Sequence, residues 1–309
     1  MKQLELAKRY FEEYGRPMIE RQFPQLKDSY AAGLAGEGSG CLGYDDEISQ
    51  DHDFAPGFCI WLSDEDFDLI GAELQAAYDR LPEEFMGFSR KNIIDKSRLG
   101  VMTVSRFYRL FTGCPDGPKT NLDWFLISES NLAAAVSGEV FVDGSGRFSD
   151  IRRRLLDFYP PDVLYKKLAA RAAVLAQSGQ YNLQRCLKRK DRAAAELAKA
   201  RFCEAAISTV FLLSKRPAPF YKWAYKGMTM LPGAEAIAPL IKDVLINPAN
   251  ETSCLKVEAI CVKLLDMMAS RGFIRRTGSD FTQDYIGQLM AKIEDPQIKR
   301  MHPMADCPV

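Results

Sequence analysis

Histidine is scarce in this sequence. The two histidines, His52 and His302, lie far apart in a chain of 309 residues, so a metal centre built on several imidazoles cannot be assembled. A cysteine nucleophile activated by histidine is equally hard to build, because Cys41 and His52 have no evident partner that would orient the imidazole. Both kinds of catalytic site are therefore disfavoured.

Long apolar runs are also missing. No stretch of 18 apolar residues occurs, which predicts that no transmembrane helix is present. The first residues carry the charges of Lys2 and Glu5 and lack the apolar region of a signal peptide. The eight cysteines include no CxxC pair, a pattern typical of reduced thiols. We therefore expect a cytoplasmic protein with no membrane partner.

A surplus of charge of one sign is lacking as well. The chain has 41 Lys and Arg residues and 41 Asp and Glu residues. This balance disfavours broad electrostatic binding, so nucleic acid is not an expected partner. The basic run at 188–192 is interpreted as a solvated helix face. An RNA-modifying transferase would need a basic surface, so the charge balance makes this function less favoured.

The apolar pattern divides the chain into two parts. Residues 1–158 alternate short apolar strands with helices, whereas residues 159–309 contain long helical patterns. We predict an α+β protein, with an N-terminal domain (1–158) whose small mixed β-sheet is flanked by helices, and a C-terminal all-helical domain (159–309). The tail after Pro296 is predicted to be loosely ordered.

A glycine-serine pair opens the stretch that carries the chemistry. Residues 30–37 are predicted to form a short strand, and Gly38 and Ser39 then fall in the turn that follows it. Glycine lets a phosphate approach the backbone closely, and the serine hydroxyl and the amides can donate hydrogen bonds to its oxygens. This turn is a candidate phosphate-binding site.

Two aspartates one position apart follow after a short spacer. A strand over residues 51–62 would place Asp51 and Asp53 on one face and His52 on the other, where a structural role is expected. Two carboxylates on one face can share a divalent cation, and their hard oxygens suit Mg²⁺. The acidic residues at 45–47 are interpreted as a solvated turn.

A third carboxylate is not found where it is expected. The predicted strand at 99–107 has no acid over residues 100–105. Glu139 and Asp143, on a predicted strand at 138–143, are the substitutes that we consider, with Glu139 as a general base for an acceptor hydroxyl. Asp143 stands beside Gly144 and is interpreted as a turn residue.

The order of these features resembles the signature of the DNA polymerase beta-like nucleotidyltransferase superfamily. The resemblance depends on the Gly38-Ser39 turn, the spacer, and the strand with Asp51 and Asp53. The full run 38–53 resembles more specifically an uncharacterised bacterial family related to the aminoglycoside and lincosamide nucleotidyltransferases. This likeness extends over most of the chain, to residues 138–143, 180–182 with Arg185, and 219–223.

The resemblance implies a function and a set of site residues. It implies that Asp51 and Asp53 bind Mg²⁺ and that Gly38 and Ser39 hold the terminal phosphates of an NTP. An NMP would then pass from the NTP to a hydroxyl of a small molecule or protein, with release of pyrophosphate.

The resemblance also implies roles in the helical half. Tyr181, Arg185 and Lys222 are expected to contact the nucleotide. The helical domain is similar to the HEPN-like class, but no histidine lies between His52 and His302, so RNA cleavage is disfavoured. The alternative is a catalytically inactive nucleotide-binding or regulatory module without the third metal-site carboxylate.

Overall fold

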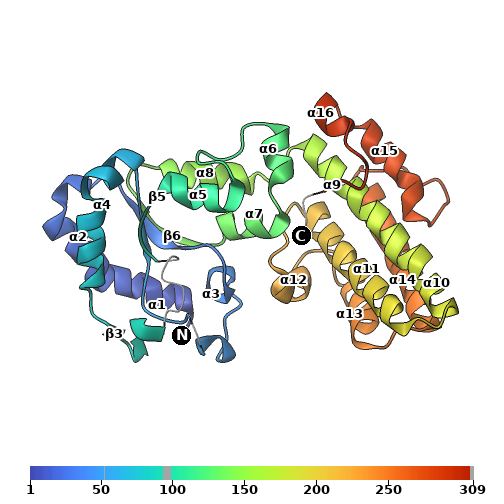
Figure 1. The fold of residues 1–309 in the computed structure, drawn as a ribbon, viewed down its shortest axis with the longest axis horizontal. Helices are drawn as coiled ribbons and strands as arrows, with labels where there is room; N and C mark the ends of the chain where they lie inside the picture. The colour runs from blue at the N-terminus through green and yellow to red at the C-terminus, as the bar shows by residue number, and fades with distance from the viewer. Residues whose placement is uncertain (52, 93–98, 307–309) are drawn as a thin grey trace. The chain divides into compact units, whose positions relative to one another are not determined.

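The computed structural model describes residues 1–51, 53–92 and 99–306. The chain forms two compact units: unit 1 comprises Met1–Pro118 and Asn131–Asp157, and unit 2 comprises Lys119–Ser130 and Phe158–Val309. Strands lie in unit 1, and the described part of unit 2 is helical (Figure 1), so the α+β class is confirmed. The division at 158/159 stays a prediction; the units differ from it by grouping Lys119–Ser130 with the second half.

A mixed four-stranded sheet forms the centre of unit 1. Its strand order is β5-β2-β1-β6, with β1 antiparallel to both neighbours and β2 parallel to β5. The strands are β1 (Ala31–Ala35), β2 (Cys59–Leu62), β5 (Gly100–Thr103) and β6 (Gly138–Asp143). Apart from Leu34, β1 consists of small residues, and it is buried along its length. A Cβ at Gly33 would lie 2.3 Å from the Glu139 carbonyl oxygen, so glycine permits close pairing with β6.

Helices cover both faces of this sheet. Alternation along β2 sends Ile60 and Leu62 into a cluster with residues of α1, α2 and α4. Trp61 points to the other face, where it stacks on Phe148 of α8 at 4.0 Å and meets Phe107 of α5 edge-on. The helices are α1 (Gln3–Tyr10), η1 (Phe11–Gly15, a π turn), α2 (Arg16–Gln22), α4 (Asp64–Asp79), α5 (Val104–Thr112) and α8 (Arg147–Leu156). A further helix, α7 (Glu129–Val136), has its first two residues in unit 2 and the others in unit 1.

The predicted strand at 99–107 is shorter in the structure. β5 ends at Thr103, and α5 begins at once because the Thr103 hydroxyl accepts a hydrogen bond from the Arg106 N–H at 2.9 Å. Such an N-cap fixes the start of a helix. The remaining short elements of unit 1 are η2 (Pro24–Leu26), α3 (Ser39–Leu42), η3 (Ile48–Gln50), β3 (Glu84–Phe85), β4 (Phe88–Ser89) and η4 (Arg90–Asn92).

Unit 2 packs its helices around α11, whose second half is almost entirely buried. Its core includes Phe202 of α11, Ile241 of α13 and Leu264 of α14. The helices are α6 (Asn121–Leu126), α9 (Pro161–Val174), η6 (Leu175–Leu183, a π-helix), α10 (Gln184–Lys188), α11 (Arg192–Leu213), α12 (Tyr221–Met228), α13 (Ala238–Ile246), α14 (Glu251–Ser270), η7 (Thr282–Tyr285), α15 (Ile286–Ala291) and α16 (Pro296–Lys299). Within the ranges that the structure describes, no helix has the length and apolar character to span a membrane.

The prediction of a loosely ordered tail is wrong as far as residue 306. Ile298 of α16 is completely buried, and the Asp306 carboxylate forms ion pairs with Lys167 and Arg171 of α9. Buried charge pairs of this kind hold a segment in place because separating them leaves charge in the protein interior.

Candidate functional site

The glycine-serine turn lies where the sequence predicts it. β1 ends at Ala35, and the chain passes through Gly36 (φ 123°) and Gly38 (φ 102°) into the short helix α3. These φ values are in the region that favours glycine. Gly38 is exposed and Ser39 is half-buried, so the turn is open to solvent.

Gln3, at the start of α1, fastens the loop that follows this turn. Its backbone N–H donates to the Asp45 carboxylate at 2.8 Å, and its side-chain amide donates to the Asp53 carbonyl oxygen at 2.7 Å. A Cβ at Gly40 would lie 2.0 Å from the Gln3 Oε1, so Gly40 makes room for this side chain. No pattern in the sequence singles out Gln3.

Asp45 is buried, which corrects the prediction of a solvated turn at this residue. Its carboxylate caps the first turn of α1 through the Gln3 N–H, and its Oδ1 lies 3.3 Å from the Lys2 ammonium. The exposed Asp46 does act as a turn residue: it accepts hydrogen bonds from the N–H of Ser49 at 3.1 Å and from its hydroxyl at 3.0 Å.

The predicted strand that would carry both aspartates is wrong in its first half. The 3₁₀ turn η3 leads directly into Asp51, which has helical backbone angles (φ −71°, ψ −30°), and Asp53 has a φ of +55°. Neither conformation belongs to a strand, and β2 begins only at Cys59. The Asp46–Ser49 contacts and Pro56 favour a folded loop here. His52 lies outside the described residues.

Strand register nevertheless gathers the predicted features at one end of the sheet. β1 runs toward the glycine-serine turn, and Gly33 of β1 pairs with Cys59, so the Asp51–Asp53 loop enters antiparallel β2 from that same end. Ala35 pairs with Gly138 and Leu34 with Glu139, which places the start of β6 there too. The turn, the aspartate loop and Glu139 thus lie at the same end of the strands, which we call the sheet edge.

Glu139 is half-exposed and paired with a lysine of α1. The Lys8 Nζ lies 2.6 Å from its carboxylate, and this hydrogen bond raises the pKa of Lys8. Arg152 holds the start of the strand, since its guanidinium donates to the Val136 and Gly138 carbonyl oxygens, both at 2.7 Å. Burial lowers the pKa of Arg152.

Asp143, at the far end of β6, has the turn role that its sequence context predicts. Its carboxylate accepts hydrogen bonds from the Gly146 N–H at 2.9 Å and the Ser149 N–H at 2.7 Å. These contacts close the turn between β6 and α8 and leave Asp143 a structural residue.

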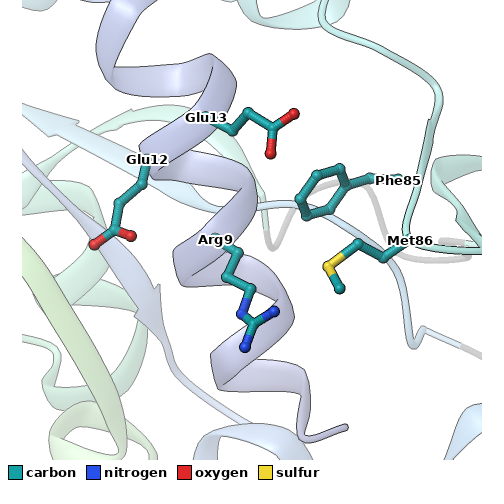
Figure 2. A pocket seen from close by; sticks show the side chains of 5 residues that line it. All are labelled: Arg9, Glu12, Glu13, Phe85 and Met86. Atoms are coloured by element: carbon teal, nitrogen blue, oxygen red, sulfur yellow. The ribbon is translucent and has the colours of Figure 1, made fainter.

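The described residues of unit 1 line hollows beside the acidic loop and beside α1. One of about 390 Å³ borders the acidic loop and is lined by Met1, Lys2, Glu5, Asp45, Asp46, Glu47 and Gln50. A second, of about 490 Å³, lies between the α1–η1 helix and the loop after β3 (Figure 2). It is lined by Arg9, Glu12, Glu13, Phe85 and Met86 and contains none of the predicted site residues.

The predicted nucleotide contacts of unit 2 lie on three elements, with Tyr181 in η6, Arg185 in the adjoining α10 and Lys222 in α12. Arg185 of α10 donates a hydrogen bond to the Tyr181 hydroxyl at 2.8 Å, with its guanidinium 4.8 Å from the ring centre. Lys222 lies on α12 with its ammonium 5.2 Å from the centre of the Trp223 ring. The structure therefore brings Tyr181 and Arg185 together, and their role stays a prediction.

Comparison with known proteins adds two similarities. A family described as a domain of unknown function (DUF4037) matches residues 124–224, about a third of the chain. The chain is also similar to the crystal structure of a nucleotidyltransferase-like protein from Exiguobacterium sibiricum 255-15, with a TM-score of 0.39 and 10% identity over 84% of this chain and 75% of that one. Among the curated proteins none matches.

The expected likeness to an uncharacterised family is confirmed over residues 124–224. That match includes Glu139, Tyr181, Arg185 and Lys222 but not the stretch 38–53. The superfamily assignment and the relation to antibiotic nucleotidyltransferases stay predictions.

The described residues supply no preformed cluster of metal ligands. Among the described residues, no three His, Cys, Asp or Glu side chains form a cluster that could hold a metal ion. Asp51 and Asp53 offer carboxylate oxygens, which Mg²⁺ accepts when substrate phosphates and waters supply its other ligands. The role of Asp51 and Asp53 as Mg²⁺ ligands stays a prediction.

Proposed function

We propose that unit 1 transfers a nucleoside monophosphate from an NTP to a hydroxyl of a small molecule or protein and releases pyrophosphate. The observation that carries the proposal is the shared sheet edge, where the strand register gathers the Gly38–Ser39 turn, the Asp51–Asp53 loop and Glu139. Nucleotidyl transfer depends mainly on positioning and charge neutralisation, which such an edge can supply.

The turn after β1 is the proposed phosphate contact. Gly38 is exposed and lacks a side chain, so phosphate oxygens can approach its backbone, and the half-buried Ser39 offers a hydroxyl donor. Gln3 fixes the loop behind the turn through Asp45 and Asp53. A preset turn costs less conformational entropy on binding than a mobile one.

Asp51 and Asp53 are the proposed ligands of the Mg²⁺ that accompanies the NTP. When bound, the ion would neutralise negative charge on the phosphate oxygens. Through the bound ion, the two carboxylates would orient the triphosphate. Both are therefore expected to matter for productive binding of the nucleotide.

Glu139 is the proposed proton acceptor. The acceptor hydroxyl oxygen forms a bond to the α-phosphorus, the bond from that phosphorus to the bridging oxygen breaks, and pyrophosphate leaves with the electron pair. The hydroxyl proton passes to the Glu139 carboxylate. Lys8 donates a hydrogen bond to Glu139 at 2.6 Å and must yield part of this contact to the hydroxyl.

A second candidate is a module that binds a nucleotide without turning it over. Two observations favour it: β5, the neighbour of β2, contains no acid, and Glu139 is engaged by Lys8. Both are compatible with nucleotide binding at the turn and would limit the chemistry that follows.

One assay separates the two candidates. The full chain is incubated with Mg²⁺ and each α-labelled NTP across pools of small-molecule and protein acceptors, and label transfer and pyrophosphate are measured. Asp51→Asn and Asp53→Asn should abolish transfer, and Glu139→Gln should lower it by about 100-fold or more while the nucleotide still binds. Asp68→Asn, at an exposed position of α4, is the matched control.

The outcomes are distinct. Binding without transfer in every pool supports the inactive module. Transfer that survives loss of both Asp51 and Asp53 contradicts the proposed metal–nucleotide site.

A further inference from the structure

Three cationic side chains of α9 are buried inside unit 2. Lys166 and Lys167 have no exposed surface, and Arg171 is 5% exposed. Lysine and arginine are rarely buried without anionic partners, because transfer of a charge out of water is costly. We call these three residues the basic site of α9.

Residues 303–306 supply the partners on one side of the basic site. Lys167 Nζ lies 2.9 Å from the Asp306 carboxylate, and Arg171 forms a second ion pair with its other oxygen. The Lys166 ammonium donates to the Pro303 carbonyl oxygen at 3.0 Å and also to that of Ala305. The Asp306 carboxylate therefore pairs with two of the three cations, and carbonyl oxygens of the same segment accept from the third.

On the opposite side of the basic site, Glu129 and Ser208 hold Arg171 in place. Arg171 Nη2 lies 2.9 Å from the buried Glu129 carboxylate, and its Nε donates to the Ser208 hydroxyl at 2.6 Å. That hydroxyl donates in turn to the same Glu129 oxygen at 2.5 Å. Arg171 is thus oriented without any contribution from Asp306.

Aromatic rings line the lysines. The Phe125 ring centre is 5.5 Å from both ammonium groups, and the Tyr159 ring centre is 4.8 Å from Lys167. Ring faces attract cations at this distance. The lysine heads therefore stay in the interior even where a carboxylate does not reach them.

The charges of these groups do not cancel. Lys166, Lys167 and Arg171 carry three positive charges, while Asp306 and Glu129 carry two negative ones. A carboxylate offers one charge and two oxygens, whereas a phosphate offers up to two charges and three or more oxygens, which suits a guanidinium with two ammonium groups.

We propose that the basic site of α9 binds a phosphate group, and that Asp306 occupies this site when the phosphate is absent. The site lies wholly in unit 2, and the proposal does not depend on nucleotidyl transfer by unit 1. Entry of phosphate requires the segment 303–306 to leave, because Asp306 and the phosphate use the same donors.

Competition with Asp306 sets the expected affinity. If residues 303–306 are displaced in about 1% of molecules, the apparent affinity for phosphate is about 100-fold weaker than that of the open site. Removal of the Asp306 charge should recover part of this difference. It also leaves three cations facing Glu129 alone, which strengthens the attraction for an added anion.

The test is a calorimetric titration of the full chain with inorganic phosphate. Asp306→Asn should bind phosphate at least about 10-fold more tightly than the natural sequence, and Lys167→Gln in the same background should abolish the gain. Glu294→Gln, at an exposed position near α16, should behave like the natural sequence. Sodium chloride at matched ionic strength controls for screening.

A second measurement avoids any variant that folds poorly. Phosphate added to the natural sequence should speed hydrogen exchange at the amides of residues 304–306, where the Ala305 N–H now donates to the His302 carbonyl oxygen at 2.8 Å. Unchanged exchange at saturating phosphate, or tighter binding by Asp306→Asn that persists in Lys167→Gln, would overturn the proposal.

Discussion

The side-chain amide of Gln3 donates a hydrogen bond to the Asp53 carbonyl oxygen, 2.7 Å away. Gln3 begins the first helix of unit 1, and Asp53 belongs to the loop that enters β2. The same residue binds Asp45 through its backbone N–H. The conformation of the aspartate loop is therefore set by a contact across about fifty positions of sequence.

Replacement of Gln3 by alanine should loosen this loop without disturbing the sheet. Gln3→Ala keeps the backbone bond to Asp45 and removes the bond to Asp53, at a cost of about 1 kcal/mol. Hydrogen exchange should become faster over residues 45–53 and stay unchanged in β5. Gln25→Ala, at an exposed position, is the control, and equal exchange rates in both variants would contradict the role of Gln3.

The space at Gly40 provides a second test of the same contact. Gly40→Ala would place a Cβ 2.0 Å from the Gln3 Oε1, so we expect a loss of about 1–3 kcal/mol in the free energy of unfolding. In the Gln3→Ala background the loss should shrink, which a double-mutant cycle in urea measures.

A glycine with free space around it supplies the comparison. A Cβ added at Gly287, in α15, would have no atom of the described residues outside its own helix turn within 4 Å, so Gly287→Ala should stabilise the chain by up to about 1 kcal/mol. Additive effects of Gly40→Ala and Gln3→Ala would show that the two residues do not compete for space.

The buried pair Arg171–Glu129 should matter far more than an exposed pair. Glu129→Gln leaves the Arg171 charge less compensated in the interior, so we expect a loss of about 3 kcal/mol, seen as a lower urea midpoint. Asp150→Asn breaks an exposed pair with Arg153 of similar length, 2.7 Å, and should cost at most about 1 kcal/mol. Similar losses in the two variants would contradict the importance of burial.

The local features of the candidate site could be predicted from the sequence. The strand before Gly38 and the turn at Gly38–Ser39 follow from a run of small residues that ends in glycines, and the structure has both. The turn role of Asp143 is likewise local, since its hydrogen-bond partners are Gly146 and Ser149.

The errors come from contacts that periodicity cannot reveal. The alternation argument for Asp51 and Asp53 assumes an extended backbone, whereas η3 and the positive φ of Asp53 fold the loop. The burial of Asp45 depends on Lys2 and Gln3. These partners are more than forty positions away, so no local pattern identifies them.

Lys166 should make stability rise with pH in the alkaline range. Burial lowers the pKa of Lys166 to about 8, with Asp306 opposing this and Lys167 and Arg171 reinforcing it. Between that value and the ordinary 10.5, the unfolded chain binds more protons than the folded one, so stability increases with pH. Between pH 7 and pH 10, the free energy of unfolding of the natural sequence should rise by about 2–3 kcal/mol relative to that of Lys166→Met, as measured by urea unfolding. Lys299→Met, at an exposed position of α16, is the control and should show no such trend. A difference in stability between the natural sequence and Lys166→Met that does not change with pH would mean that the Lys166 ammonium is not destabilised by its burial.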